Sequence, residues 1–435
     1  MNIARLNFSH GSYDNHAMLM KNIRKASSKL KTAVGIMQDL QGPKIRVSEL
    51  TSPITIKAKQ TVVIGKDFSM DFDVSGDIKP GHRVLIEDGT IELIVKKVSG
   101  KNITCVVKTP GVIRSHKGMN LPDTKVKARI LTDKDISDLK FGLKNDVDFV
   151  AMSFVRSAAD VKFIKELIKK YLPKDAVSPK VVVKIELPQA IENFDEILNQ
   201  TDCVMVARGD LGVEVPDSQV PALQKMMIRK CQAAAKPVIV ATQMLDSMIR
   251  NPKPTRAEVS DVAGAVIDKA DCVMLSGESA YGKYPLEAVS EMNRIIIDTE
   301  NSPYTVSLHR FQGDLHESRI AVFADSVAYL SENIGATAII SATETGHTAR
   351  FLSHPRPEVP VIMFSANPTV VRQMQMIWGV IPILLPQANK VLEVLEKTII
   401  AAKSRGLVQK GDIVVIVTGN PLGKRVNLLE VKTVH

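Results

Sequence analysis

The feature of the sequence that most constrains its fold is a series of short apolar runs separated by helix-length stretches. Seven such runs precede residue 280: 2–8, 33–39, 148–154, 181–186, 203–208, 237–242 and 272–277. Runs that are β-branched and nearly continuously apolar are typical of parallel strands covered on both faces. Their alternation with helical patterns such as 158–171 and 220–235 predicts a parallel sheet with right-handed crossovers, either doubly wound or closed as a barrel.

Two other segments follow different patterns. Between residues 43 and 130 the apolar runs are short, alternate with polar residues and are punctuated by Gly, Pro and Asp, which indicates an all-β insertion. From about residue 302 another α/β unit appears, with candidate strands at 338–341, 360–364, 381–385 and 412–418 and helices at 318–333, 368–378 and 390–405. We therefore predict a catalytic barrel domain (1–42 and 125–301), an inserted β lid (43–124) and a C-terminal α/β domain (302–435).

The number of βα units is itself informative. A barrel of parallel strands closes with eight units, and only seven are visible, the first beginning at residue 2. Either the sheet is open, or one unit is missing before Met1. The motifs described below favour the second interpretation, a TIM-type (β/α)8 barrel that lacks its first βα unit.

Composition excludes several classes of protein. No run approaches the roughly 18 uncharged apolar residues of a membrane-spanning helix, and Met1 leads directly into an amphipathic pattern rather than a secretory leader. The four cysteines are far apart and show no C-x-x-C spacing, so we expect a reduced, cytoplasmic protein without disulfides or a zinc site.

The net charge of +10 raises the question of nucleic-acid binding. Residues 43–130 carry 16 Lys and Arg against 9 Asp and Glu, but few aromatic residues and no nucleic-acid motif. A basic lid over an anionic small molecule explains this distribution better. We therefore expect no nucleic-acid partner.

Polar and charged residues gather at the C-terminal ends of the predicted strands, the edge where barrels of this architecture carry their active sites. They are Asn7 and Ser9, Asp39, Ser153, Lys184 with Glu186, Arg208 with Asp210, Thr242, and Ser276 with Glu278. Taken singly, each of these residues more often ends a strand than takes part in chemistry. Their agreement at the same end of successive strands predicts a site.

The residue types narrow the reaction. Glu186 and Asp210 offer hard oxygen ligands that suit Mg²⁺ or Mn²⁺ rather than zinc. Lys184 and Arg208 each precede one of these carboxylates by two residues, and strand alternation predicts that each points the same way as its carboxylate. No Ser, His or Cys stands in a convincing nucleophile–base arrangement. The pattern favours electrostatic, metal-assisted catalysis, as phosphoryl transfer or enolate chemistry requires.

Several longer motifs carry a resemblance to a known family. They are NIARLNFSHG (2–11), VVKIE (182–186), VMVARGDLGVE (204–214), KPVIVATQMLDSM (236–248), PTRAEVSDVA (254–263) and DCVMLSGESA (271–280). Together they resemble pyruvate kinase over essentially the whole chain. The resemblance implies a glycolytic enzyme that transfers a phosphoryl group from phosphoenolpyruvate to ADP, giving pyruvate and ATP.

The resemblance also implies roles for individual residues. Glu186 and Asp210 would hold the Mg²⁺ or Mn²⁺ ion, and Lys184 would stabilise charge on the phosphoryl group and on the enolate. The residues expected to contact phosphoenolpyruvate or pyruvate are Arg5, Lys184, Gly209 through its backbone, Asp210 and Thr242, with Lys184, Arg5 and Thr242 catalytic. Those expected to contact the nucleotide phosphates are Arg46, His10 and Lys140.

The chain departs from the family pattern at a monovalent-cation site. Asn7, Ser9, Asp39 and the Leu40 carbonyl match the potassium ligands, but the chain reads DLQGPKIR (39–46) where potassium-dependent members resemble DTKGPEIR. Lys44 therefore replaces a glutamate, and its tethered ammonium could supply the charge that K⁺ otherwise provides. We expect activity that does not require potassium; the alternative is that Lys44 is a solvated hinge residue.

Two further departures concern the ends of the chain. The family normally has about one βα unit before residue 2, which supplies the missing eighth strand, so we interpret the chain as a truncated form. In the C-terminal domain the loop of Thr343, Thr345, Gly346 and Thr348 lies where sugar-phosphate effectors bind in regulated relatives, and a helix N-terminus there would attract phosphate. Glu344 adds a negative charge, so another phosphorylated effector, or none, is equally consistent.

Two alternatives remain open. One is another barrel enzyme that acts on phosphoenolpyruvate or pyruvate through a metal-bound enolate, although such relatives lack the inserted lid. The other is a catalytically silent remnant, which only the missing unit supports. The resemblance also implies a homotetramer formed through the barrel and C-terminal domains.

Overall fold

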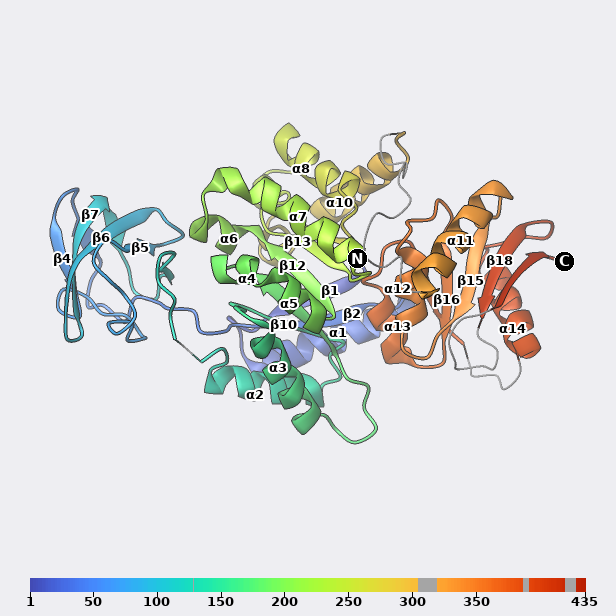
Figure 1. Ribbon diagram of the computed structural model, residues 1–435, viewed down its shortest axis with the longest axis horizontal. Coiled ribbons are helices and arrows are strands. Elements are labelled where there is room, and N and C mark those ends of the chain that lie inside the picture. Colours follow the sequence, from blue (N-terminus) through green and yellow to red (C-terminus); the bar gives the residue numbers. More distant parts are fainter. Residues whose placement is uncertain (128, 304–318, 386–390, 419–427) are drawn as a thin grey trace.

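The computed structural model describes residues 1–435 except 128, 304–318, 386–390 and 419–427. Three parts follow one another along the long axis: an all-β part, a central parallel sheet wrapped by helices, and a second α/β part (Figure 1). No helix in the described ranges has both the length and the apolar character that crossing a bilayer requires.

The central sheet consists of seven parallel strands whose spatial order is their order in the chain. They are β1 (Ile3–Asn7), β2 (Gly35–Leu40), β10 (Phe149–Met152), β11 (Lys180–Ile185), β12 (Cys203–Ala207), β13 (Val238–Ala241) and β14 (Cys272–Met274). Within the described residues β1 and β14 form the two edges, each paired on one side only. The predicted barrel-type α/β fold is thus confirmed as an open, barrel-like sheet.

Helices lie along the outside of this sheet (Figure 1). They are α1 (Tyr13–Leu30), α2 (Asp133–Lys144), α3 (Ala158–Tyr171), α4 (Pro188–Glu192), α5 (Phe194–Gln200), α6 (Arg208–Glu214), α7 (Val220–Ala233), α8 (Arg256–Ile267), α9 (Gly277–Ala280) and α10 (Pro285–Glu300). Short 3-10 turns occur at Asp217–Gln219 and Asp246–Ile249. Capping boxes at Thr132 and Thr255 define the starts of α2 and α8.

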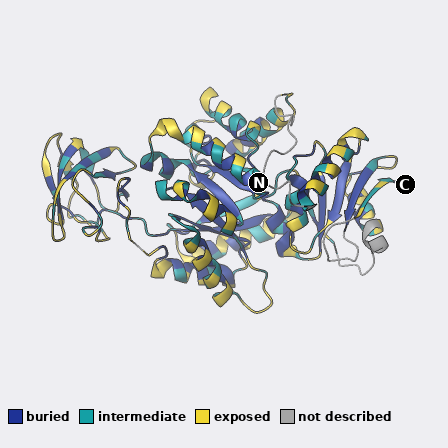
Figure 2. Cartoon of the chain, in the orientation of Figure 1, coloured by how far each residue is buried: buried dark blue, intermediate teal, exposed yellow. Residues whose placement is uncertain are grey.

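Apolar packing on both faces holds the central sheet. Every residue of β2, β10, β12 and β13 is buried, as the dark strands of Figure 2 show. Side chains such as Val150 and Val204 face the helices, whereas Phe149 and Met205 pack on the inner face of the sheet. This two-sided burial is the physical reason for the continuous apolar runs in the sequence.

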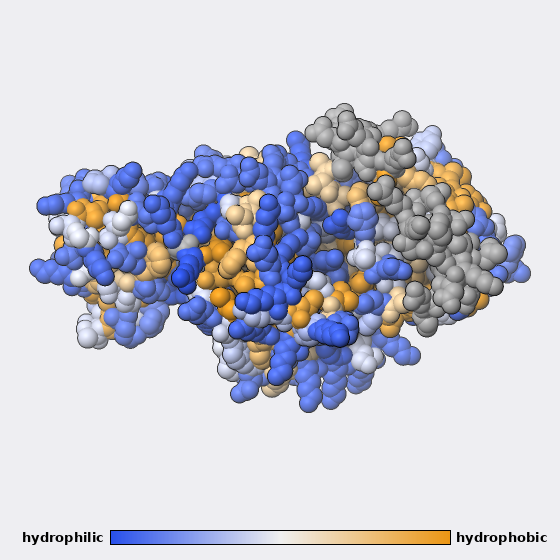
Figure 3. Space-filling view, turned by 60° about the horizontal axis from the view of Figure 1, so that its bottom comes forward, coloured by the Kyte–Doolittle hydropathy of each residue, from blue (hydrophilic) through white to orange (hydrophobic). Residues whose placement is uncertain are grey.

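The inserted all-β part has its own hydrophobic core. Its strands are β3 (Ile54–Ile56), β4 (Thr61–Ile64), β5 (Arg83–Ile86), β6 (Ile91–Ser99), β7 (Asn102–Thr109), β8 (Gly111–Ile113) and β9 (Met119–Asn120), paired antiparallel as β3-β8 and β4-β7-β6-β5-β9. In the space-filling view this part forms a largely hydrophilic lobe, set off from the central part by an indentation (Figure 3). We call it the lid.

The C-terminal part contains a five-stranded sheet in the order β17-β16-β15-β18-β19. Its strands are β15 (Ala338–Ala342), β16 (Val361–Ser365), β17 (Val380–Leu384), β18 (Ile413–Thr418) and β19 (Leu428–Thr433), with helices α11 (Arg319–Asn333), α12 (His347–Ser353), α13 (Pro368–Met374) and α14 (Val391–Ser404). Sequence reasoning missed β19, an antiparallel edge strand. The predicted helix 368–378 is too long, because α13 ends at Met374. The predicted domain boundary at 301/302 lies beside residues outside the described ranges.

A buried carboxylate joins the central sheet to the C-terminal part. Asp148 accepts hydrogen bonds from Arg372 Nε at 2.7 Å, from Arg24 Nη2 at 2.9 Å and from the Ile36 N–H at 2.8 Å. Arg372 belongs to α13 and Arg24 to α1, so one side chain of the sheet connects three elements. The Asp148 side chain is 0% exposed, and loss of its charge would leave two arginines without their buried partner.

We predict that Asp148→Asn destabilises the protein by about 3 kcal/mol, because Arg24 loses its carboxylate partner and Arg372 keeps only the exposed carboxylate of Asp146. Thermal unfolding followed by circular dichroism measures the effect as a fall in Tm. The matched control is Asp195→Asn, which removes an exposed pairing with Lys230 and should leave Tm nearly unchanged. Equal Tm values for the two variants would contradict this account of the junction.

Candidate functional site

A cluster of charged side chains lies at the C-terminal ends of the central strands. Arg5 Nη2 lies 2.6 Å from Asp39 Oδ2. Lys184 Nζ lies 2.8 Å from Glu186 Oε1 and 3.5 Å from Asp39 Oδ1. The cluster therefore brings together residues from β1, β2 and β11, as the predicted positions at the strand ends require.

Neighbouring polar groups fix the orientation of the cluster. Ser153 Oγ lies 2.8 Å from Lys184 Nζ, from which it accepts a hydrogen bond, and donates one to the Leu40 carbonyl at 2.9 Å. Glu186 Oε2 accepts a hydrogen bond from the Phe154 N–H at 2.8 Å. Because these partners belong to β2 and to the end of β10, the register of the parallel sheet determines where the charges meet.

Burial and mutual attraction control the protonation of the cluster. Burial alone would raise the pKa of Asp39, but Lys184 and Arg5 together hold it below its usual value. Burial opposes the charge on Lys184, yet the carboxylates of Asp39, Glu186 and Asp210 raise its pKa. Burial raises the pKa of Glu186, Lys184 opposes that rise, and Asp210 adds to it. The lysine thus stays charged, while the carboxylate pair favours a further cation.

Asp210 approaches the cluster from the first turn of α6, and its side chain is 27% exposed. Its Oδ1 lies 3.2 Å from Lys44 Nζ. Lys44 belongs to the segment that leads into the lid, so the ammonium at the predicted cation site pairs with Asp210. Asn7 Oδ1 instead accepts the Ser9 N–H at 3.1 Å, and the Leu40 carbonyl accepts from Ser153.

The expectation that Arg208 and Asp210 point the same way along a strand is wrong. β12 ends at Ala207, and Arg208 begins α6, so strand alternation does not apply. The guanidinium of Arg208 donates instead to Asp261 Oδ1 and to the Thr242 carbonyl, each at 2.7 Å. Its role is to hold the turn after β13.

That turn has an unusual conformation at Thr242, whose φ is +71°. A β-branched residue rarely adopts a positive φ, and such conformations persist only where surrounding contacts enforce them. Thr242 Oγ1 accepts a hydrogen bond from the Gly209 N–H at 2.8 Å. Two of the predicted substrate-binding groups are therefore direct neighbours, and a side chain at Gly209 would contact Thr242 Oγ1 at 3.4 Å.

The structure brings only part of the predicted nucleotide-binding set to this face. His10 is exposed just after β1, and Arg46 lies at the base of the lid, where its N–H donates to Asp71 Oδ1 at 2.7 Å. Lys140 is not brought to the cluster: its ammonium lies 4.6 Å from the ring centroid of Tyr171, the last residue of α3.

Lys134, which sequence reasoning missed, lies at the same end of the central strands as the charged cluster. It occupies the first turn of α2, and its Nζ donates to the Phe8 carbonyl at 2.7 Å and to Asp138 Oδ2 at 2.6 Å. Phe8 follows β1 directly, next to Ser9 and His10. The signal available in the sequence was the position of Lys134 in the first turn after the Thr132 helix cap, nearly two turns nearer the strand ends than Lys140.

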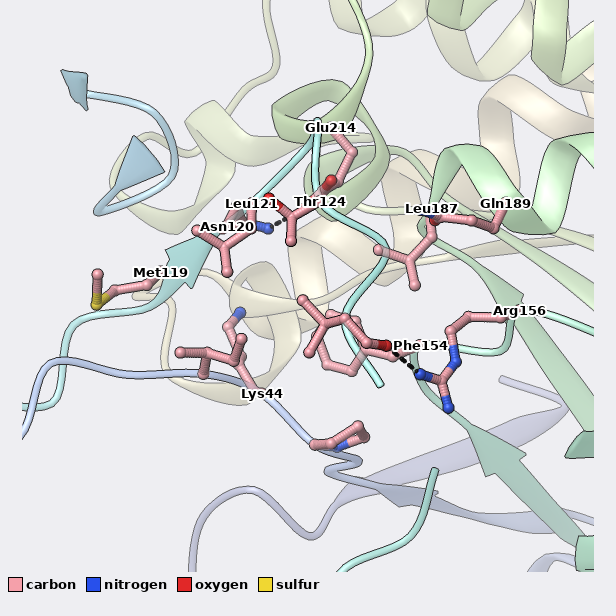
Figure 4. A pocket seen from close by; sticks show the side chains of 13 residues that line it. Lys44, Met119, Asn120, Leu121, Thr124, Phe154, Arg156, Leu187, Gln189 and Glu214 are labelled. Carbon is pink, nitrogen blue, oxygen red and sulfur yellow. Dashed lines mark hydrogen bonds between the residues drawn. The ribbon is translucent and has the colours of Figure 1, made fainter. Parts of the chain in front are cut away.

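A pocket of about 620 Å³, including the space open to solvent, lies between the lid and the central sheet. Figure 4 shows Asn120 of β9 and Glu214 of α6 meeting beside it, with Lys44 on the lid side. Asn120 Nδ2 donates to Glu214 Oε1 at 2.8 Å. Burial raises the pKa of Glu214 to about 7, with a further contribution from Asp210.

The predicted effector loop caps α12 in the C-terminal part. The Gly346 N–H donates to Thr343 Oγ1 at 3.1 Å, and Gly346 has a φ of +79° immediately before the helix. Thr345 is exposed, and Thr348 is in the first turn. The loop thus lies at the start of a helix, as the pattern predicted, and its effector remains a prediction.

The oxygen atoms of the cluster fit a divalent metal. Glu186 Oε1 and Asp39 Oδ1 are buried, and Lys184 Nζ lies 2.8 Å from the first and 3.5 Å from the second. Glu186 and Asp210 supply two hard carboxylate ligands. Within the described residues no group of three or more His, Cys, Asp and Glu is gathered as a metal site. Two carboxylates, water and substrate oxygens are the usual surroundings of Mg²⁺, rather than an all-protein cage.

Comparison with known protein families assigns the N-terminal two thirds of the chain and the C-terminal part to the same family. Residues 1–289 match the family model described as pyruvate kinase, barrel domain, and residues 322–432 match pyruvate kinase, alpha/beta domain. The chain belongs to the pyruvate kinase family. The resemblance predicted from the motifs is thereby confirmed.

Individual relatives extend the match over the full chain. A pyruvate kinase of Clostridium acetobutylicum is 40% identical over 100% of this chain and 94% of its own length. A pyruvate kinase of Geobacillus stearothermophilus is 39% identical over 100% of this chain and 76% of its own length. The crystal structure of a pyruvate kinase from Cryptosporidium parvum superposes with a TM-score of 0.92 at 36% identity, covering 100% of this chain and 91% of that one.

We predict that Glu214→Gln makes the protein more stable at pH 8 and leaves its stability unchanged near pH 4. Because the folded-state pKa of about 7 exceeds the value of 4.5 expected when unfolded, the wild type loses stability as the pH rises between these values. The gain at pH 8 is at most about 3 kcal/mol. Thermal unfolding from pH 4 to pH 8 measures it, and parallel Tm curves for the two proteins would contradict the prediction.

Proposed function

We propose that this chain catalyses the transfer of a phosphoryl group from phosphoenolpyruvate to ADP, giving pyruvate and ATP. The observation that carries the proposal is the cluster of Arg5, Asp39, Lys184 and Glu186 at the strand ends, with Asp210 beside it. Phosphoryl transfer needs fixed positive charge and a metal site rather than a protein nucleophile. The cluster offers fixed positive charge and two carboxylates that suit a divalent metal, in a chain of the pyruvate kinase family.

In this proposal Glu186 and Asp210 hold Mg²⁺ or Mn²⁺. When bound, the ion supplies Lewis-acid polarisation of phosphoryl and enolate oxygens. Lys184 stays protonated and stabilises negative charge on the phosphoryl group and on the enolate oxygen. Arg5, whose side chain is 24% exposed, offers a guanidinium that can bind phosphate from the open side.

Thr242 and Gly209 form the opposite wall of the proposed substrate site. The hydrogen bond between them fixes the turn after β13 against the start of α6. The Thr242 hydroxyl, which donates to the Ala241 carbonyl at 2.6 Å, borders the place where enolpyruvate would be protonated. We assign these residues to binding and orienting the three-carbon substrate.

The proposed nucleotide contacts are Arg46 and His10, to which we add Lys134 in place of Lys140. Arg46 connects this set to the lid, so closure of the lid would bring its charge toward the phosphates and exclude water. The remaining predictions from the family also stay proposals: a homotetramer in the cytoplasm, with a phosphorylated effector at the loop around Gly346.

Pyruvate formation from phosphoenolpyruvate and ADP with Mg²⁺ tests the proposal. We expect Lys184→Met to lower kcat by about a hundredfold to a thousandfold, because it removes a preorganised charge from the transition state. The control is Lys180→Met, at the opposite end of the same strand, which should keep its activity. A folded wild type that forms no pyruvate would favour a silent remnant, and equal loss in both variants would contradict the role of Lys184.

Lys44 gives a separate prediction about monovalent cations. We propose that its ammonium, 3.2 Å from Asp210 Oδ1, supplies the charge that K⁺ provides in potassium-dependent relatives. Replacing Na⁺ by K⁺ should then change kcat/KM little in the wild type. Lys44→Glu should become dependent on K⁺ by about tenfold or more, which corresponds to roughly 1.4 kcal/mol of transition-state stabilisation. Activation of the wild type by about tenfold would contradict the prediction.

A further inference from the structure

A second charged hollow lies at the opposite end of the central strands, against the C-terminal part. Lys236, which precedes β13, and Asp271, which precedes β14, line it from the central sheet. Arg350 and His354, on and just after α12, line it from the other side. Its volume is about 260 Å³, including the space that opens to solvent. The hollow is therefore shared between two parts of the chain.

Positive charge predominates around this hollow. Five cationic side chains gather here, whereas the carboxylates that interact with them are Asp202 and Asp271. Lys236, Arg350 and Arg356 line the hollow. Lys165 and Lys180 lie outside its lining but close enough for their charges to interact with Lys236 and Arg350. Both carboxylates are already engaged: Asp202 Oδ1 lies 3.1 Å from Lys165 Nζ, and Asp271 Oδ1 lies 3.0 Å from Arg356 Nη1.

Arg350, Lys180 and Lys236 are left without a carboxylate partner. Within the described part of the chain none of them forms an ion pair. Arg350 Nε is also buried without any hydrogen-bond acceptor, which is unusual for a guanidinium inside a protein. Lys236 donates only to main-chain carbonyls, those of Leu198 and Thr201.

The protonation of these groups reflects the same imbalance. Burial, followed by the charge of Arg350, lowers the pKa of Lys236 to about 8. Burial, followed by the charge of Arg350, also lowers the pKa of Lys180 after partial compensation by Asp202. Like charges held together in a half-buried hollow destabilise one another unless an anion joins them.

We propose that this hollow binds a phosphate group, either inorganic phosphate or the phosphate of a small phosphomonoester. A doubly charged anion beside Arg350 and Lys236 would satisfy the free Arg350 Nε and offset the excess positive charge. Because α12 also carries the loop around Gly346 at its other end, a ligand here would join α12 to the N-terminal ends of β13 and β14. The site is separate from the catalytic cluster, and the proposal does not rest on the proposed activity.

Isothermal titration of the full chain with inorganic phosphate tests the proposal, and a parallel titration uses glycerol 3-phosphate. Because phosphate can also bind near Arg5, both titrations are repeated with Arg5→Gln. We expect one saturable site that survives Arg5→Gln and weakens by about tenfold or more in Arg350→Gln, which removes a charge-assisted hydrogen bond. Binding of both ligands indicates an open site for phosphomonoesters, and binding of phosphate alone indicates a site for the free ion.

Arg405→Gln, another arginine of the C-terminal part, is the matched control and should bind phosphate as the wild type does. Without phosphate, Arg350→Gln should have the same Tm as the wild type or a higher one, because the substitution removes repulsion between like charges. If Arg350 had only a structural role, the same substitution would lower the Tm. With phosphate, the Tm of the wild type should rise and that of Arg350→Gln should not. Binding that is lost in Arg5→Gln but unchanged in Arg350→Gln would overturn this proposal and leave the proposed activity untouched.

Discussion

The interaction on which the site depends is the burial of the Lys184 ammonium between Asp39 and Glu186. None of these charges would be stable alone in an apolar sheet, so each requires the other two in place. Their positions follow from the parallel register of β2, β10 and β11, and Ser153 fixes the lysine from the strand between them. The core of Phe149 and its neighbours lies beneath the cluster and excludes water from it. This packing therefore contributes to the pKa shifts of Asp39, Lys184 and Glu186. The fold and the site cannot be separated at this point.

Asp210 connects this cluster to the lid. It raises the pKa of both Glu186 and Lys184, and it pairs with Lys44 at the base of the lid. Asn120 of the lid and Glu214 form a second contact between the lid and the central part, and Glu214 belongs to the same short helix as Asp210. Asp210 and Glu214 lie about one turn apart on α6, so the lid contacts the same short helix that carries one of the proposed metal ligands.

Sequence reasoning identified what depends on periodicity and failed where the chain leaves a regular element. The apolar runs gave the seven strands, and alternation correctly placed Lys184 beside Glu186. The same rule failed for Arg208, because the strand ends one residue earlier and a helix begins. Periodicity also does not describe turns or helix starts. It therefore could not predict the positive φ of Thr242. It also could not show that Lys134, rather than Lys140, lies near the strand ends. β19 was missed because none of its residues is fully buried and the charged Glu430 and Lys432 interrupt its apolar residues, which leaves no continuous apolar run.

The central claim is that the strand-end cluster is a divalent-cation site made by Glu186 and Asp210. Titration with Mn²⁺, followed by electron paramagnetic resonance of the free ion, tests it most directly. The account predicts one site per chain that weakens by about tenfold or more in Glu186→Gln and in Asp210→Asn. Glu278→Gln should bind as the wild type does, because that buried carboxylate at a neighbouring strand end already accepts the Leu245 and Ser276 N–H groups. Unchanged Mn²⁺ binding in both Glu186→Gln and Asp210→Asn would contradict the account.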